Sequence, residues 1–169
     1  MVQILQLQYD TSKYQPLYDS IFDVNRKDVF IDEYFDEKTI KDRPKLINLN
    51  SEINNLIQET KKLMEQNKFK INEERFYVEF HKYNIQGQYQ PMFDWHEDDN
   101  GAVNYNVCTC IYYLHKDETI IDGDLQFTEI DVKIKPNLAV LFNGYETHRI
   151  SLMDGHGQRK SIVFMFERI

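Results

Sequence analysis

The pattern of apolar and polar positions changes character near residue 70. Before it, apolar side chains recur at steps of three and four residues, the period of one helical face, at Ile53, Leu56, Ile57, Leu63 and Met64. A shorter helix is predicted to begin near Pro16 and to turn Leu17 and Ile21 inward. Residues 25–44 are charged and aperiodic, and this pattern predicts a long loop. Residues 1–70 are therefore expected to form a mainly helical layer.

After residue 70 the apolar period becomes two, which is typical of half-buried β-strands. Within residues 75–83, the side chains of Phe76, Val78 and Phe80 fall on one face of the predicted strand. The opposite face carries the more polar set Tyr77, Glu79, His81 and Tyr83. Further strands are predicted at residues 107–114, 125–127, 130–134, 138–142, 148–152 and 160–166.

Short turn signals separate these strands. Pro136-Asn137 and Asn143-Gly144 predict two tight turns, and residues 154–157 (Asp-Gly-His-Gly) predict a turn that joins the last two strands. Many short strands with turns between them favour a β-sandwich or barrel. The chain is thus expected to be α+β and a single domain, with the helical layer of residues 1–70 packed on an antiparallel β-domain of residues 71–169.

Composition and charge narrow the functional classes. A length of 169 residues suits one domain, and 41% hydrophobic residues are enough to form a packed core. No apolar run reaches 18 residues and the first ten lack a basic start, so we expect a cytoplasmic protein without a membrane span. The net charge of -8 makes nucleic acid an unlikely partner, because binding to phosphates relies on clustered Lys and Arg. Cys108 and Cys110 are predicted to be buried thiols in a reducing compartment.

One group of residues has the composition of a metal site. His96 and Asp98 are two positions apart, so an extended backbone places both side chains on the same side. His148 follows 50 residues after Asp98, at the start of another predicted strand. Two histidines and one carboxylate form the facial triad that suits non-haem Fe(II) and leaves coordination positions open. Each residue alone has a plainer interpretation, as a surface-loop or strand-end histidine.

Arg159 adds a second feature. It lies 11 residues after His148 and is predicted to share one strand face with Ser161. An arginine that points into a β-sandwich requires an anionic partner, and its planar guanidinium suits a carboxylate. A dicarboxylic 2-oxo acid could therefore chelate a metal at one end and meet Arg159 at the other. Lys160 and Arg149 are the alternative partners for this carboxylate.

The order His-x-Asp, His, Arg-x-Ser resembles the 2-oxoglutarate/Fe(II)-dependent oxygenases, and within them the prolyl-4-hydroxylase-like branch that includes the hypoxia-type prolyl hydroxylases. Residues 108–117 look like the strand that follows the His-x-Asp loop in that branch. Residues 122–125 (Asp-Gly-Asp-Leu) stand where the branch has a Gly-Gly-x-Leu turn, and residues 134–142 resemble the strand before the distal histidine. The resemblance extends from Arg75 to Phe166; the first Gly of the turn is replaced by Asp122.

The resemblance implies a jelly-roll (double-stranded β-helix) core, Fe(II), 2-oxoglutarate and O₂, with ascorbate as a supporting reductant. It makes His96, Asp98 and His148 the metal ligands and catalytic centre. Arg159 would bind the distal carboxylate of 2-oxoglutarate. The co-substrate pocket would be completed by Tyr113, Tyr83, Thr109 and Ser161.

The implied reaction is hydroxylation of a C–H bond with release of succinate and CO₂. A peptidyl prolyl residue is the first substrate that the resemblance implies, although a peptide, a protein or a small molecule fits the class. Two alternatives remain at this point: a cupin-like metal enzyme that does not use 2-oxoglutarate, and a non-catalytic β-sandwich binding module. His81 is predicted to be a satisfied strand histidine, and Glu97 and Asp99 to be solvated.

Overall fold

The structure is a computed structural model that describes residues 2–22, 31–32, 41–42, 45–46, 51–91, 94–98 and 106–169. Its helices are η1 (Thr11–Tyr14), α1 (Gln15–Ile21) and α2 (Ser51–Gln66). Its strands are β1 (Gln3–Gln6), β2 (Ile31–Asp32), β3 (Lys41–Asp42), β4 (Lys45–Leu46), β5 (Ile71–Gln86), β6 (Val107–Lys116), β7 (Ile120–Asp122), β8 (Leu125–Phe127), β9 (Asp131–Val132), β10 (Leu138–Asn143), β11 (His148–Ile150) and β12 (Met153–Arg168).

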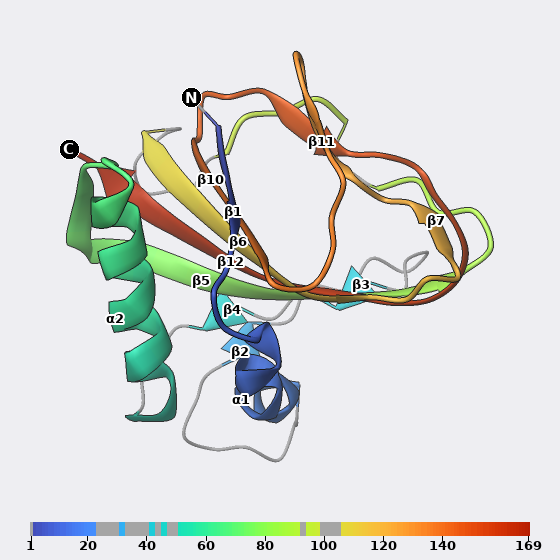
Figure 1. Ribbon diagram of the computed structural model, residues 1–169, viewed down its shortest axis with the longest axis horizontal. Coiled ribbons are helices and arrows are strands. Elements are labelled where there is room, and N and C mark those ends of the chain that lie inside the picture. The colour runs from blue at the N-terminus through green and yellow to red at the C-terminus, as the bar shows by residue number, and fades with distance from the viewer. Residues whose placement is uncertain are drawn as a thin grey trace.

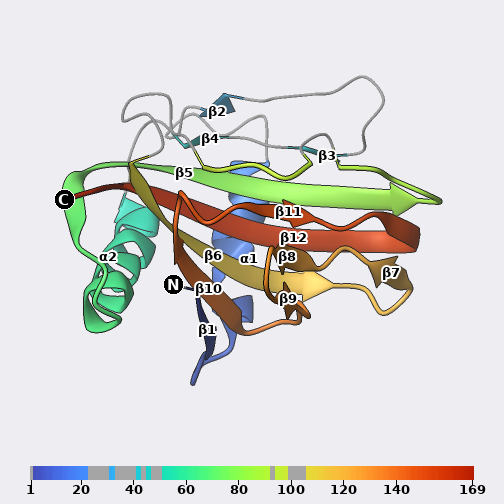
Figure 2. The ribbon, with the colours of Figure 1, turned by 90° about the horizontal axis from the view of Figure 1, so that it is seen from above.

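The strands of the described residues form one large and one small antiparallel sheet. The large sheet has the order β1-β10-β6-β12-β5-β4-β2, with β3 paired to β5 and β7 paired to β12. The small sheet has the order β11-β8-β9. Figure 2 shows β5, β12, β6 and β10 side by side, with β8, β9 and β11 overlapping them in this view. Because β12 lies between β5 and β6, the last strand of the chain joins the two halves of the large sheet.

The helices cover one face of the large sheet, as Figure 1 shows. Apolar residues of α1 and α2 pack there against alternate residues of β5, β6 and β12, such as Phe80, Tyr112 and Phe164. The three- and four-residue steps of α2 explain this packing, since Leu56, Ile57 and Met64 are all buried. The helical layer predicted from periodicity is confirmed.

The opposite face of the large sheet packs against the small sheet. This inner core contains Ile111, Val140 and Val163 of the large sheet, with Leu125 and Phe127 of β8. The central strand β6 is therefore covered on both faces, and residues 107–114 are all buried. Two facing antiparallel sheets of this kind form the jelly-roll core that the sequence predicted, so the α+β fold class is confirmed.

The last strand differs from its prediction. Residues 154–157 do not form a turn between two strands but lie within β12, which begins at Met153. Its first residues pair with β7 and its later residues with β5 and β6. Gly155 has φ +92°, and a Cβ there would lie 2.0 Å from the carbonyl oxygen of Thr119. Glycine was therefore needed for close approach to β7, and its signal was mistaken for a turn.

The N-terminal region also contains strands that the periodicity did not predict. Residues Gln3–Gln6 pair with Leu138–Leu141 of β10 and extend the large sheet. Within the predicted loop of residues 25–44, the described residues are the short strands β2 and β3, and the rest of the loop lies outside the described residues. Short edge strands carry too few residues to show a period of two. Among the described residues, no helix is long and apolar enough to cross a membrane.

Candidate metal centre

Three side chains predicted to bind a metal come together at the edge of the jelly-roll. One ligand atom each from His96, Asp98 and His148 lies within 4.8 Å of the others. The Asp98 Oδ1 atom is 3.0 Å from Nε2 of His148 and 3.9 Å from Nε2 of His96. Both imidazoles thus turn the same nitrogen towards one carboxylate oxygen, which is the arrangement of a metal site.

The backbone fixes this convergence. His96 and His148 face each other in an antiparallel bridge, with N–H···O distances of 3.0 and 2.9 Å in the two directions. The amide of Asp98 donates to the carbonyl of Gly144 at 2.9 Å, so the next ligand is anchored as well. The two-residue spacing of His96 and Asp98 then places both side chains on the same side, as the sequence predicted.

The hydrogen bonds of the imidazoles favour metal binding. Nδ1 of His96 lies 2.7 Å from the carbonyl oxygen of Asp94, and Nδ1 of His148 lies 2.7 Å from that of Glu146. A carbonyl only accepts, so in the neutral imidazole Nδ1 carries the proton and Nε2 presents a lone pair. Such backbone partners commonly orient metal-binding histidines. The donor set therefore fits a divalent transition metal.

Thr109 holds the carboxylate. Its hydroxyl donates to Oδ2 of Asp98 at 2.6 Å, and both residues are buried. With Oδ2 engaged, Oδ1 is the oxygen that faces the two imidazoles. The sequence placed Thr109 among the pocket residues but gave no signal for this contact, because the residues are 11 positions apart in different segments.

His148 lies in an aromatic environment. The rings of Phe142 and Phe127 pack against its imidazole with centroid distances of 4.8 and 5.7 Å. Burial alone would lower the pKa of His148, but the hydrogen bond and charge of Asp98 outweigh it, so the pKa is raised. The carboxylate of Asp98 thus favours a positive charge, such as a proton or a metal ion, between itself and the imidazole of His148.

Arg159 is buried farther along the same inner face. It is 1% exposed, and its Nε donates to the carbonyl of Gly123 at 3.1 Å. Its guanidinium lies over the rings of Tyr83 and Tyr113, 5.4 Å from each centroid. Burial raises the pKa of Tyr113 to about 12, although the charge of Arg159 opposes the shift. The Tyr113 hydroxyl therefore stays protonated at neutral pH and can donate a hydrogen bond to an anion.

A buried acid and a second cation lie near Arg159. Asp124 is 5% exposed and pairs with Lys133 at 2.7 Å and with Lys116 at 3.9 Å. Burial lowers the pKa of Lys116, partly offset by the charge of Asp124. The strand register pairs Lys116 with Arg159. The sequence analysis predicted no role for Lys116 or Asp124. For Asp124, its place in the Asp-Gly-Asp-Leu turn of residues 122–125 was a signal that could have identified it.

The alternative cations lie elsewhere. Arg149 pairs with Asp94 at 3.0 Å and stacks on the ring of Trp95, so it belongs to the rim beside His96. Lys160 lies over the ring of Tyr18, on the face covered by α1. Of these three cations, Arg159 is the one that lies on the inner face, as its strand position predicted. Ser161 is buried and paired in register with Tyr113.

The remaining predictions have mixed outcomes. Glu97 is exposed as expected, and Asp99 lies outside the described residues. Cys108 and Cys110 are buried and form no disulfide, which confirms the prediction of two buried thiols. His81 has a partner as predicted, namely the buried carboxylate of Glu79. The sequence placed Glu79 on the correct strand face but gave it no role.

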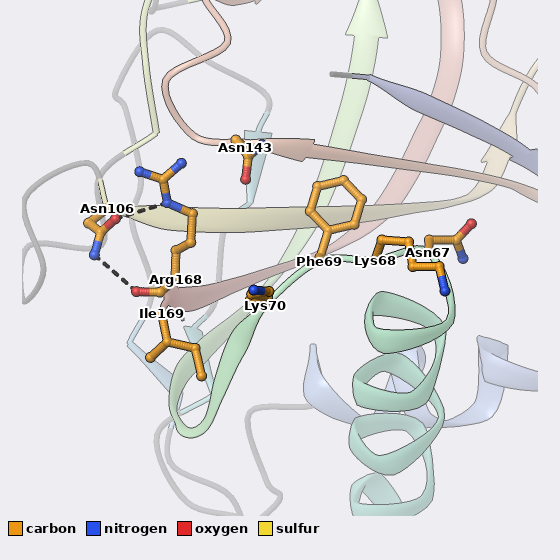
Figure 3. A pocket seen from close by; sticks show the side chains of 8 residues that line it. All are labelled: Asn67, Lys68, Phe69, Lys70, Asn106, Asn143, Arg168 and Ile169. Carbon is orange, nitrogen blue, oxygen red and sulfur yellow. Dashed lines mark hydrogen bonds between the residues drawn. The ribbon is translucent and has the colours of Figure 1, made fainter.

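A pocket lies apart from these residues. Figure 3 shows it between the end of α2 and the ends of β10 and β12, where the side chains of Arg168 and Asn106 take part in two hydrogen bonds between these residues. Its lining consists of Asn67, Lys68, Phe69, Lys70, Asn106, Asn143, Arg168 and Ile169. None of these lining residues belongs to the candidate metal site. The assignment of that site therefore rests on the ligand atoms of His96, Asp98 and His148 and not on this pocket.

Comparison with known proteins agrees with the geometry. The model of the 2OG-Fe(II) oxygenase superfamily matches residues 78–167, more than half of the chain. A search of the curated proteins gave no match.

Solved structures share the fold at low sequence identity. A prolyl-4-hydroxylase from Pseudomonas putida has a TM-score of 0.66 at 14% identity, over 99% of this chain and 92% of the other. A 2OG-Fe(II) oxygenase family protein from Burkholderia pseudomallei gives 0.68 at 10% identity, over 99% and 86%. A prolyl hydroxylase from Trichoplax adhaerens, in complex with a peptide fragment of the hypoxia inducible factor oxygen degradation domain, gives 0.64 at 13%, over 99% and 83%. With the matched family model and the His-Asp-His cluster, these likenesses lead to one conclusion: the chain belongs to the 2OG-Fe(II) oxygenase superfamily.

Proposed function

We propose that this oxygenase hydroxylates a C–H bond and that His96, Asp98 and His148 hold its Fe(II). The observation that carries the proposal is the convergence of both Nε2 atoms on Oδ1 of Asp98, with both Nδ1 atoms tied to backbone carbonyls. Three protein ligands on one side of an ion leave positions for a co-substrate and O₂. Iron with 2-oxoglutarate supplies the oxidising chemistry, and succinate and CO₂ leave as by-products.

Arg159 is proposed to bind the distal carboxylate of 2-oxoglutarate. Its buried guanidinium offers a planar pair of donors, and the neutral hydroxyl of Tyr113 supplies a third. Tyr83 packs on the guanidinium and limits its movement. Ser161 lies between Arg159 and Met165 on β12, and Met165 pairs in register with Thr109. Ser161 would therefore contribute to the same co-substrate site. Thr109 would hold Asp98 in the orientation that metal binding needs.

The protein itself positions the metal ligands and shields the reacting carbon from water. The bridge between His96 and His148 fixes the ligands before any metal arrives, so little conformational entropy is lost on binding. The apolar residues of the inner core limit the access of water to the oxidised carbon. The proposal treats residues 1–169 as a single domain, and the large sheet shared by the helical layer and the jelly-roll supports this.

A prolyl residue is the first substrate to test. Several of the structurally similar proteins are named as prolyl hydroxylases, and one of them was solved in complex with a peptide fragment. A peptide or protein substrate is therefore part of the proposal.

Anaerobic titration of 2-oxoglutarate into the Fe(II)-loaded protein tests the proposal through the metal-to-ligand charge-transfer band. The wild type should show a saturable band, Arg159→Ala should need far more 2-oxoglutarate, and His148→Ala should show none. No band in a folded, iron-loaded wild type would refute the use of 2-oxoglutarate. A screen of proline-containing peptides for succinate release then follows.

A further inference from the structure

The pocket of Figure 3 combines volume with positive charge. Its volume is about 440 Å³, within the range of about 300–1,000 Å³ that is usual for small-molecule sites. Its lining includes three cations, Lys68, Lys70 and Arg168. Phe69 of the lining packs in the outer core, whereas the metal centre packs against Phe142 of the inner core. The pocket therefore lies on the outer, helical side of the large sheet.

The positive charge of this lining is not balanced by acids. None of the described residues that line the pocket has an acidic side chain. Within the described part of the chain, Nζ of Lys68 and Nζ of Lys70 form no salt bridge and no hydrogen bond. Even if the main-chain carboxylate of Ile169, the last residue of the sequence, is counted, three cations against one carboxylate leave an excess of positive charge. Cations gathered in a concave site attract anions, although the whole chain carries a net charge of -8.

Arg168 is held by its neighbours in an orientation that leaves donors for a ligand. Its Nε donates to Oδ1 of Asn106 at 3.1 Å, and Nδ2 of Asn106 donates to the carbonyl of Arg168 at 3.0 Å. The guanidinium also lies over the ring of Tyr145, 5.0 Å from its centroid. Its two terminal nitrogens donate to none of the described residues. A planar guanidinium that is already held in place loses little freedom when it binds an oxyanion.

Lys68 has a backbone conformation that lysine rarely adopts, with a φ of +70°. The amide of Lys68 donates to the carbonyl of Glu65, and the amide of Phe69 donates to that of Met64, both at 3.0 Å. Helix α2 thus ends in a Schellman motif, whose left-handed position is usually Gly or Asn. A charged side chain stands here where glycine would be less strained, and such strain is concentrated at functional sites.

We propose that this pocket binds a small organic molecule that carries at least two negative charges on phosphate or carboxylate groups. Lys68, Lys70 and Arg168 would bind these groups, because Lys and Arg suit both oxyanions. The volume is larger than a simple inorganic ion needs, and Phe69 and Ile169 provide apolar surface for the rest of the molecule. The site uses neither the Fe(II) ligands nor Arg159, so the inference goes beyond the proposed function.

Calorimetric titration of the full chain, at low salt and without added metal, tests the pocket. AMP and citrate are the anionic probes, and adenosine and citramide are their neutral partners. At least one anionic probe should bind in one-to-one stoichiometry and at least about tenfold more tightly than its neutral partner, since hydrogen bonds between charged groups contribute this much. A preference for AMP would identify phosphate as the ligand group, and a preference for citrate would identify carboxylates.

Variants of the two lysines separate the charge from the fold. Lys70→Gln removes the charge and should weaken the anionic probe about three- to tenfold. Lys68→Gly should weaken it as much, yet its midpoint of urea unfolding should be equal to or higher than that of the wild type, because glycine adopts a positive φ without strain. Lys135→Gln removes an exposed lysine that does not line the pocket, and it should bind the probe as the wild type does.

Three results would overturn the inference. The first is no saturable binding of either anionic probe, and the second is equal binding of each anionic probe and its neutral partner. The third is the same affinity in the wild type, Lys70→Gln and Lys68→Gly, which would place the probe elsewhere on the protein. None of these measurements involves Fe(II) or 2-oxoglutarate, so the proposed function stands or fails separately.

Discussion

At the scale of single residues, the site consists of charged groups held by uncharged neighbours. The carboxylate of Asp98 is oriented by Thr109, and the imidazoles of His96 and His148 are oriented by backbone carbonyls. Such partners of the ligands commonly affect metal affinity by about 10- to 100-fold. The properties of the centre therefore depend on residues that do not touch the metal.

Replacement of Thr109 tests this dependence. Thr109→Val keeps the shape of the side chain but removes the hydroxyl that holds Oδ2 of Asp98. We expect Fe(II) to bind about 10-fold more weakly or worse, as measured by anaerobic equilibrium titration. Thr60→Val removes another buried hydroxyl, far from the site, that hydrogen bonds to Tyr112. Equal iron affinity in Thr109→Val and Thr60→Val would show that the contact with Asp98 is irrelevant to the metal.

Arg159→Lys tests the shape of the cation rather than its charge. Lysine is a point charge that cannot offer the planar pair of donors, so half-saturation should need roughly 10-fold more 2-oxoglutarate. The measurement is the charge-transfer titration, and Arg168→Lys at the distant end of the same strand is the matched control. A lysine variant with wild-type affinity would place the carboxylate elsewhere, with Lys116 as the first residue to examine.

At the scale of elements, β12 is the strand that connects β5, β6 and β7 by pairing with all three. It pairs with β7 through its first residues and with β5 and β6 through the rest, and it carries Arg159 and Ser161. This long strand must pass close to the residues before β7, and Gly155 makes that passage possible. Because of this close approach, β12 can pair first with β7 and then continue as the strand between β5 and β6.

Gly155→Ala should therefore destabilise the protein far more than Gly87→Ala. Both glycines have positive φ values, +92° and +85°, so both substitutions strain the backbone. A Cβ at Gly155 would also meet the Thr119 carbonyl at 2.0 Å, whereas nothing lies within 4 Å at Gly87. We expect an added loss of about 1–3 kcal/mol in the free energy of unfolding, measured by urea denaturation. Similar losses in both variants would disprove the close approach.

At the scale of the whole molecule, the helical layer and the jelly-roll share one sheet. The outer core joins α1 and α2 to β5, β6 and β12, and the inner core joins β6, β10 and β12 to the small sheet. Among the described residues, the strands of the helical layer all belong to the large sheet and form no sheet of their own. The two parts are therefore expected to unfold together.

Ligand binding should then stabilise the molecule as one unit. A metal ion that binds only the folded protein adds about 2.7 kcal/mol at a concentration 100 times its dissociation constant. We predict a single calorimetric transition in the apo-protein that moves upward as a whole with Ni²⁺ as an O₂-stable substitute for Fe(II), but does not move in Asp98→Asn. A second transition whose midpoint temperature is the same with and without Ni²⁺ would mean that residues 1–70 fold as a separate domain.

The sequence by itself determined the features that depend on neighbouring residues. The helical step of residues 53–64 and the two-residue period of residues 75–83 follow from backbone geometry, so both elements were predicted. The same geometry places Asp98 beside His96 and turns Arg159 to the inner face. The order of these residues along the chain was also enough to indicate the oxygenase superfamily.

Only the tertiary structure decided which distant groups meet. Strand pairing between separate segments forms the backbone bridge between His96 and His148. It also brings the hydroxyl of Thr109 to Asp98 and buries Glu79. Such pairing is set by register and packing across the whole sheet, and no local period records it. The glycine at position 155 illustrates the limit: the residue type indicated unusual backbone, but only the neighbouring Thr119 carbonyl showed that the reason is close packing and not a turn.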